Sequence, residues 1–260
     1  MKIKVHRSRI SKKRCEIFAF PRYIRGKNDL SIGTESPQTV TKLNLERSPA
    51  VYNEEAAVGF YAIRNIKEII TRMQSERDAF GRRLNKLAGT FSDIVLSEDG
   101  IVGKFSENGA LFAFKGGLKP DESVQKALIT ALRMRYVLNK LNREWDFYLY
   151  ARGISAPGGK DAWQVGFGVD FGNTAFQEQR EYITISGQPG KIARGIGHSA
   201  GSSQILITES LYRQFPFLEK VFELKAQRHV PVKGENFLCK IREVVSTAGP
   251  QAKNIYTEYV

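Results

Sequence analysis

The chain has 260 residues, of which 42% are hydrophobic, and it carries a formal net charge of +13 at pH 7. This length and apolar content can build a substantial core, but no apolar run reaches the roughly 18 residues of a membrane-spanning helix and no secretory signal is visible. Cys15 and Cys239 are isolated and form no CxxC pair, so we expect neither a zinc site nor a disulfide framework, and we expect a cytoplasmic protein.

The positive charge is concentrated near the N-terminus. Residues 1–30 contain ten basic and two acidic side chains. Such a segment attracts anionic partners such as a nucleic acid or a membrane surface, although it can equally be a solvated face that keeps the protein soluble. A strand is expected at 14–24, and residues 27–55, rich in Asn, Ser, Thr, Pro and charge, are expected to be a loop or linker. We therefore assign residues 1–50 to a basic extension.

The next segments predict a strand, helices and a hairpin. The continuous apolar run 56–61 is typical of a buried strand, and the apolar spacing over 63–73 predicts a helix. Helical propensity continues to Asp99 and Gly100. Two apolar runs, 101–105 and 110–114, then flank Asn108 and Gly109, a pair that tolerates positive φ and predicts a tight hairpin turn.

The second half alternates helices and strands. The clearest helix is expected at 119–145, where Pro120 and Asp121 form a start signal. Strands are expected at 146–155, 163–177, 181–187 and 203–208, helices at 191–201 and 209–215, and a final hairpin at 222–244 with its turn at 233–236. Asp170, beside glycine, is interpreted as a turn residue. The order indicates an α+β protein with a split βαβ, ferredoxin-like, mostly antiparallel sheet and helices packed on it.

Several stretches together resemble the class III nucleotidyl cyclase catalytic domain, which converts a nucleoside triphosphate to a cyclic nucleotide. They read VGFYAIRNIKEI (58–69), GKFSENGALFAF (103–114), YITISGQPGKIARGI (182–196), AGSSQILITESLY (200–212) and VPVKGENFLCKIREV (230–244). The resemblance covers about residues 55–245 and implies the fold of that family. We therefore predict a cyclase-homology domain at 51–246 and a C-terminal tail at 247–260.

The resemblance also points to the positions that hold metal in the family. Cyclisation there uses two divalent cations held by two aspartates, because such cations prefer carboxylate oxygens. The matching positions here are Ala62 and Asn108, and neither side chain carries a charge. Glu107 is the nearest possible substitute. No metal cofactor is expected unless displaced carboxylates take over.

Two further sets of positions follow from the resemblance. The family's transition-state asparagine and arginine, supplied by the partner subunit, correspond to Lys191 and Gly195, with Arg194 one residue out of register. A step of one residue turns a helical side chain by about 100°. The purine-reading positions correspond to Lys104 and Thr184, which are retained as polar residues, and Lys191 can still hold a phosphate.

Three hypotheses remain open. The first is a catalytically degenerate cyclase homologue, a pseudoenzyme that forms a homodimer, binds a purine nucleotide and acts in cyclic nucleotide signalling. The second is an active cyclase that uses displaced groups such as Asp99, Glu107, Lys191 and Arg194 with Mg²⁺ or Mn²⁺. The third is a nucleic-acid or membrane-surface adaptor acting through residues 1–27.

Overall fold

The computed structural model describes residues 51–106, 108–115, 119–153, 162–179 and 182–248. The strand predicted at 14–24, the basic extension at 1–50 and Glu107 lie outside these residues, so the adaptor hypothesis and the predicted domain boundaries stay predictions. Within the described part, no helix is long and apolar enough to cross a membrane.

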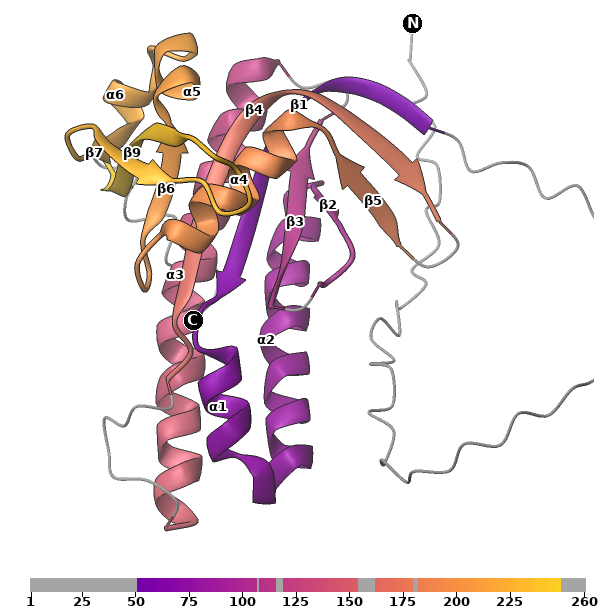
Figure 1. The fold of residues 1–260 in the computed structure, drawn as a ribbon, viewed down its shortest axis with the longest axis vertical. Coiled ribbons are helices and arrows are strands. Elements are labelled where there is room, and N and C mark those ends of the chain that lie inside the picture. Colours follow the sequence, from indigo (N-terminus) through magenta and orange to yellow (C-terminus); the bar gives the residue numbers. More distant parts are fainter. Residues whose placement is uncertain (1–50, 107, 116–118, 154–161, 180–181, 249–260) are drawn as a thin grey trace, which may run out of the picture. The chain divides into compact units, whose positions relative to one another are not determined.

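The described strands form one mixed sheet (Figure 1). Its main path runs β2 (Ile101–Val102), β3 (Gly109–Phe114), β1 (Val51–Ile63), β4 (Val165–Glu178), β6 (Ile205–Thr208), β9 (Leu238–Thr247) and β7 (Phe222–Leu224). β5 (Ile183–Ser186) pairs with β4, and β8 (Arg228–Pro231) pairs with β9. Each named pairing is antiparallel except that of β4 with β6. The predicted α+β, mostly antiparallel class is confirmed.

The helices cover both faces of this sheet. In chain order they are α1 (Ile66–Arg72), α2 (Arg77–Ser97), α3 (Pro120–Ala151), α4 (Gln188–Ser199), α5 (Glu209–Gln214) and α6 (Leu218–Val221), with a 3₁₀ turn at Gln74–Glu76. Helices α1, α2 and α3 share one apolar cluster with the sheet, whereas α4 packs on two other clusters. The sheet is therefore a buried layer between helices.

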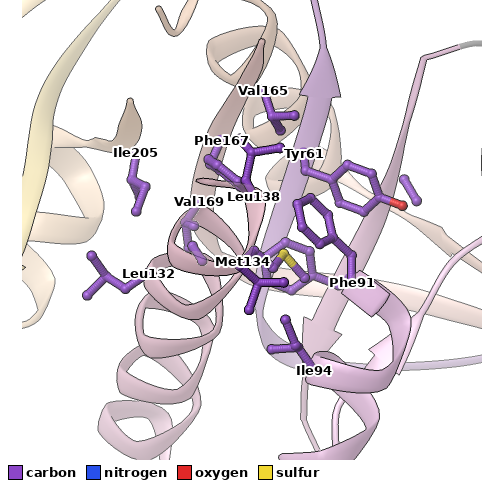
Figure 2. Packing of buried hydrophobic residues seen from close by; sticks show 14 of the residues in the cluster. Tyr61, Phe91, Ile94, Leu132, Met134, Leu138, Val165, Phe167, Val169 and Ile205 are labelled. Atoms are coloured by element: carbon purple, nitrogen blue, oxygen red, sulfur yellow. The ribbon is translucent and has the colours of Figure 1, made fainter. Parts of the chain in front are cut away.

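Strand β1 shows why this arrangement needs apolar residues on both faces. Successive side chains of a strand point to opposite faces, so a strand covered on both sides reads as a continuous apolar run. Tyr61 and Ile63 belong to the cluster formed with α2 and α3, while Phe60 and Ala62 belong to the cluster that includes α4. Figure 2 shows Tyr61 beside Phe91 of α2, and the two ring centroids are 5.0 Å apart.

Helix α4 approaches β4 closely because glycines line the contact. A Cβ atom on Gly168 would lie 2.2 Å from the carbonyl oxygen of Ala193 and 2.6 Å from the backbone nitrogen of Gly197. These are distances that a real side chain does not tolerate. The glycine therefore sets how near the helix lies to the strand.

Three predicted boundaries were wrong. Helix α3 continues to Ala151 through the segment predicted as a strand from residue 146, because Trp145 and Leu149 keep its apolar face buried. Strand β1 begins at Val51, within the segment expected to be a linker. Helix α4 begins at Gln188, three residues early, and carries a proline in its first turn, where the missing N–H costs no helical hydrogen bond.

The hairpin forms as predicted, but its glycine has a different role. Ser106 and Gly109 exchange two backbone hydrogen bonds of 2.8 and 2.7 Å, so they close the hairpin one residue before the predicted position. Gly109 does not have a positive φ. A Cβ atom there would lie 1.9 Å from the carbonyl oxygen of Tyr61, so glycine is needed for the approach of β3 to β1.

The glycine contact between α4 and β4 gives a test of the packing. We expect Gly168→Ala to lower the free energy of unfolding by about 2 kcal/mol or more, because the new methyl group overpacks the contact. The matched control is Gly81→Ala in α2, where a Cβ would meet nothing within 4 Å. We expect it to raise the free energy of unfolding by about 0.5–1 kcal/mol through helix propensity. Urea unfolding of both variants measures this, and equal effects would contradict the packing.

Candidate functional site

The structure brings the two positions matched to metal ligands side by side. Strand β1 pairs with β3 so that Ala62 faces Gly109, the residue after Asn108. The backbone N–H of Ile63 donates to the carbonyl oxygen of Asn108 at 2.6 Å, and the side-chain Nδ2 of Asn108 donates to the carbonyl oxygen of Ile63 at 3.2 Å. The end of β1 and the hairpin tip thus form one small unit.

The residues of this unit do not fit a pair of divalent cations. Ala62 is fully buried among apolar side chains, including Phe60 and Leu111. Asn108 is neutral, and its amide nitrogen is engaged with the backbone. Over the described residues, no group of three or more His, Cys, Asp or Glu side chains is placed to hold a metal ion. Hard cations need several oxygen ligands, and the side chains of Ala62 and Asn108 together offer one neutral oxygen.

The nearby acidic residue Asp99 is placed elsewhere. It lies in the turn between α2 and β2, at the opposite end of the hairpin from Asn108. Its side chain is 93% exposed, and its Oδ2 lies 3.7 Å from Nζ of Lys126. Asp99 is therefore not a replacement ligand at the hairpin tip. Glu107 lies outside the described residues.

Helix α4 carries the positions matched to the transition-state pair. Lys191 is exposed, whereas Gly195 is buried against the hairpin of β8 and β9. A Cβ atom on Gly195 would lie 2.2 Å from Cγ1 of Val232, so this packing leaves no room for a longer side chain. Arg194 turns away from that contact, with its guanidinium carbon 5.4 Å from the ring centroid of Phe60. Of the three positions, Gly195 has no room for a functional side chain, whereas Lys191 and Arg194 are both exposed to solvent.

The two positions matched to purine recognition lie near each other: Lys104 follows strand β2, and Thr184 lies within β5. A parallel bridge joins Gly103 to Ile183, which places Lys104 next to Thr184. Nζ of Lys104 lies 4.9 Å from the ring centroid of Tyr182, within the range of a cation–π contact. Tyr182 was not predicted from the sequence, although an aromatic residue two positions before Thr184, directly before β5, was a usable signal.

Asp170 is the second residue that the sequence analysis missed. It lies inside β4 and is only 9% exposed, so its interpretation as a turn residue was wrong. Its Oδ1 accepts a hydrogen bond of 2.7 Å from Oγ1 of Thr208. Burial raises the pKa of its carboxyl group to about 6, against the opposing hydrogen bonds from Thr208 and the Phe171 backbone. The usable signal was a single charge within an apolar strand.

Sequence comparison finds no relative, since neither a family model nor a curated protein matches the chain. Comparison of structures does find similar proteins. The adenylyl cyclase CyaB of P. aeruginosa has a TM-score of 0.63 at 21% identity, over 76% of this chain and 96% of that one. A rhodopsin-guanylyl cyclase catalytic core with converted specificity, in complex with ATPαS, has a TM-score of 0.58 at 18% identity, over 76% and 99%.

A third similar structure is the non-canonical dimeric guanylyl cyclase domain of the RhoGC fusion protein from the aquatic fungus Blastocladiella emersonii. It has a TM-score of 0.56 at 16% identity and covers 76% of this chain and 99% of that one. All three matches span almost the whole of a cyclase catalytic domain, in agreement with the resemblance seen in the sequence motifs. The described part of the chain therefore has the fold of the class III nucleotidyl cyclase catalytic domain.

Proposed function

We propose that the chain is a catalytically degenerate nucleotidyl cyclase homologue that binds a purine nucleotide and serves as a dimerising regulatory module in cyclic nucleotide signalling. The observation that carries this proposal is the pairing of β1 with β3. This pairing brings Ala62 and Asn108 close together, as expected for two positions that hold metal ligands in the family. Here, however, the two side chains are a methyl group and a neutral amide.

The electrostatic argument concerns the triphosphate and its cations. Attack of a ribose hydroxyl on the α-phosphate needs a cation to lower the pKa of the hydroxyl and another to clamp the triphosphate. Carboxylates hold such cations because they supply negative charge as well as oxygen atoms. Ala62 supplies neither, and the carboxamide of Asn108 supplies a single neutral oxygen. Cyclisation would therefore lack both cations, and we propose no metal cofactor.

The positions on α4 support the same conclusion. Lys191 can reach a phosphate, but Gly195 has no side chain to stabilise charge in a transition state, and Val232 fills the space where one would start. In the family, each active site combines carboxylates of one chain with the polar pair of the other. This chain retains neither half, so pairing with an active partner would not rebuild a complete site from it.

Binding of a nucleotide is supported by the positions that remain polar. The isolated bridge between Gly103 and Ile183 brings Lys104 and Thr184 together, and the ring of Tyr182 beside Lys104 offers a face on which a purine can stack. A similar structure, the rhodopsin-guanylyl cyclase core, contains ATPαS. Lys191 is the proposed phosphate contact. A homodimer is proposed because one crystal structure of the similar domain from Blastocladiella emersonii is a non-canonical dimer, although another is monomeric.

A turnover assay tests the loss of activity. We expect purified protein incubated with ATP or GTP and either Mg²⁺ or Mn²⁺ to form no cyclic nucleotide above the level without enzyme. An active class III cyclase in the same assay is the positive control. Cyclic product from this chain that disappears in the Glu107→Gln variant would show that a displaced carboxylate holds the metal, contrary to the proposal.

A binding measurement tests the purine site separately. We expect ATP to raise the melting temperature of the protein, because a ligand of the folded state stabilises it by mass action. Lys104→Ala should weaken binding about tenfold through loss of a charge-assisted contact. Lys140→Ala, which removes an exposed lysine from α3, should bind like the unmodified protein. If the two variants bind ATP equally, Lys104 has no role in binding.

A further inference from the structure

An open pocket of about 520 Å³ lies between β4, the junction of β6 with α5, and the start of β9. Its lining contains none of the positions matched to metal, purine or transition-state contacts. The volume lies in the range of pockets that hold small organic ligands. The proposed function assigns no role to this pocket. Its lining combines a buried acidic side chain with exposed basic ones.

The pocket lining includes a buried acid. Asp170 is 9% exposed, and the donors to its carboxylate, the Thr208 hydroxyl and the Phe171 backbone N–H, are both uncharged. A carboxylate can accept about four hydrogen bonds, so it retains capacity for a ligand. A buried charge with only neutral donors is costly, and donors from a ligand would lower that cost.

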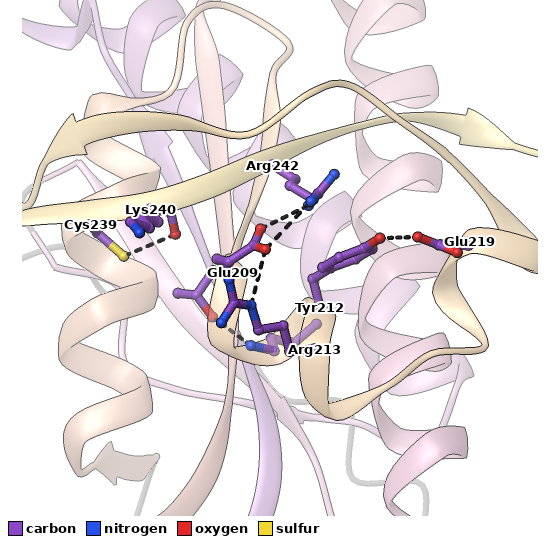
Figure 3. Close-up of polar contacts among 9 residues, drawn as sticks. Glu209, Tyr212, Arg213, Glu219, Cys239, Lys240 and Arg242 are labelled. Carbon is purple, nitrogen blue, oxygen red and sulfur yellow. Dashed lines mark hydrogen bonds and ion pairs between the residues drawn. The ribbon is translucent and has the colours of Figure 1, made fainter.

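The other lining acid is already compensated by arginines. Oε2 of Glu209 lies 2.8 Å from Nε of Arg242, and its Oε1 lies 3.3 Å from Nε of Arg213 (Figure 3). The hydrogen bond from Arg242 lowers the pKa of Glu209, which keeps it ionised. The negative charge of Glu209 is therefore neutralised by Arg242 and Arg213. Asp170 is therefore the acceptor in the lining that a ligand can use.

Cations and aromatic rings complete the lining. The side chain of Arg213 is 72% exposed, and Lys240 on β9 is exposed as well, so positive charge faces the solvent side. Figure 3 shows Cys239 and Lys240 on β9 alongside Glu209 and Arg213. Phe171 and Phe237 are also among the lining residues; the ring of Phe171 packs edge-on against Phe215 with centroids 4.9 Å apart, whereas Phe237 is 44% exposed. An exposed ring such as that of Phe237 offers stacking surface to a planar ligand.

We infer that this pocket binds a guanine nucleotide, with the base on Asp170 and the phosphate on Arg213 and Lys240. Guanine presents two adjacent donors, N1–H and the exocyclic amine, to one carboxylate, whereas adenine presents an acceptor at N1 that a carboxylate would repel. The phosphate suits cations at the rim, since guanidinium and ammonium groups bind it by charge-assisted hydrogen bonds. The inference does not depend on the purine positions of the proposed function.

The base contact is tested with the Lys104→Ala protein, so that the proposed purine site contributes little. Calorimetric titration should show that GMP binds at least tenfold more tightly than AMP. Asp170→Asn should reduce GMP affinity at least tenfold, because the amide turns a donor toward the donors of guanine, while its oxygen can still accept from Thr208. Equal affinity for GMP and AMP, unchanged GMP affinity in Asp170→Asn, or no saturable binding at millimolar GMP would overturn the inference.

The phosphate contact is tested with an exposed residue, whose replacement does not endanger folding. Lys240→Gln should weaken GMP binding severalfold and leave guanosine binding unchanged, because guanosine has no phosphate. Lys140→Gln is the matched control on α3 and should change neither. Equal losses for GMP and guanosine in Lys240→Gln would contradict the assigned orientation. Failure of ATP to bind at Lys104 would refute the proposed function and leave these results intact.

The pH dependence of guanosine binding gives an independent readout. The pKa of Asp170 is raised to about 6, so its carboxylate becomes protonated as the pH falls from 7.5 to 5.5, and guanosine affinity should fall severalfold. The other charged or titratable groups lining the pocket are Glu209, Arg213, Cys239 and Lys240. The pKa of Glu209 is lowered by its hydrogen bond from Arg242 and that of Cys239 is raised by burial, so neither of these two groups changes charge over this interval. A flat profile would contradict the role of Asp170.

Discussion

The close pairing of β1 with β3 is the constraint on which the rest of the structure depends. Gly109 lies under the carbonyl oxygen of Tyr61, where no Cβ atom fits, and this contact fixes which residues stand opposite one another. The same register buries β1 between α2 and α3 on one side and α4 on the other. It also determines that Ala62 and Asn108 are neighbours. The register of β1 with β3 therefore determines both the packing of the sheet and the geometry of the candidate site.

That geometry combines the fold of a nucleotidyl cyclase catalytic domain with uncharged residues at the positions matched to its metal ligands. A fold can be retained through apolar periodicity and glycine contacts while the charged groups that act on a substrate are lost. In this chain the positions matched to cation ligands carry a methyl group and an amide. At Gly195, Val232 fills the space that a side chain would need. The polar features that remain are Lys104 beside Tyr182 and the buried Asp170, on which the two proposed binding sites rest.

Much of the fold could be predicted because local patterns agree with it. The apolar run of β1, the amphipathic spacing of α3 and the turn at Gly234, which has a φ of 93°, were all readable from the sequence. The predictions failed where contacts between distant parts of the chain determine the local structure. Helix α3 extends beyond its predicted end because its last turns are buried. Gly109 is required by the close approach of β3 to β1, which no local sequence pattern reveals. Asp170 was missed because burial and the partner Thr208, 38 residues away, depend on the folded sheet.

We propose above all that the unit formed by Ala62 and Asn108 does not hold the two cations of a cyclase. The most direct measurement is a crystal structure of the protein grown with Mn²⁺ and a non-hydrolysable nucleoside triphosphate, with anomalous scattering recorded from manganese. We expect no anomalous peak beside the hairpin tip. A pair of manganese peaks there, ligated by Glu107 or other acidic side chains, would contradict it.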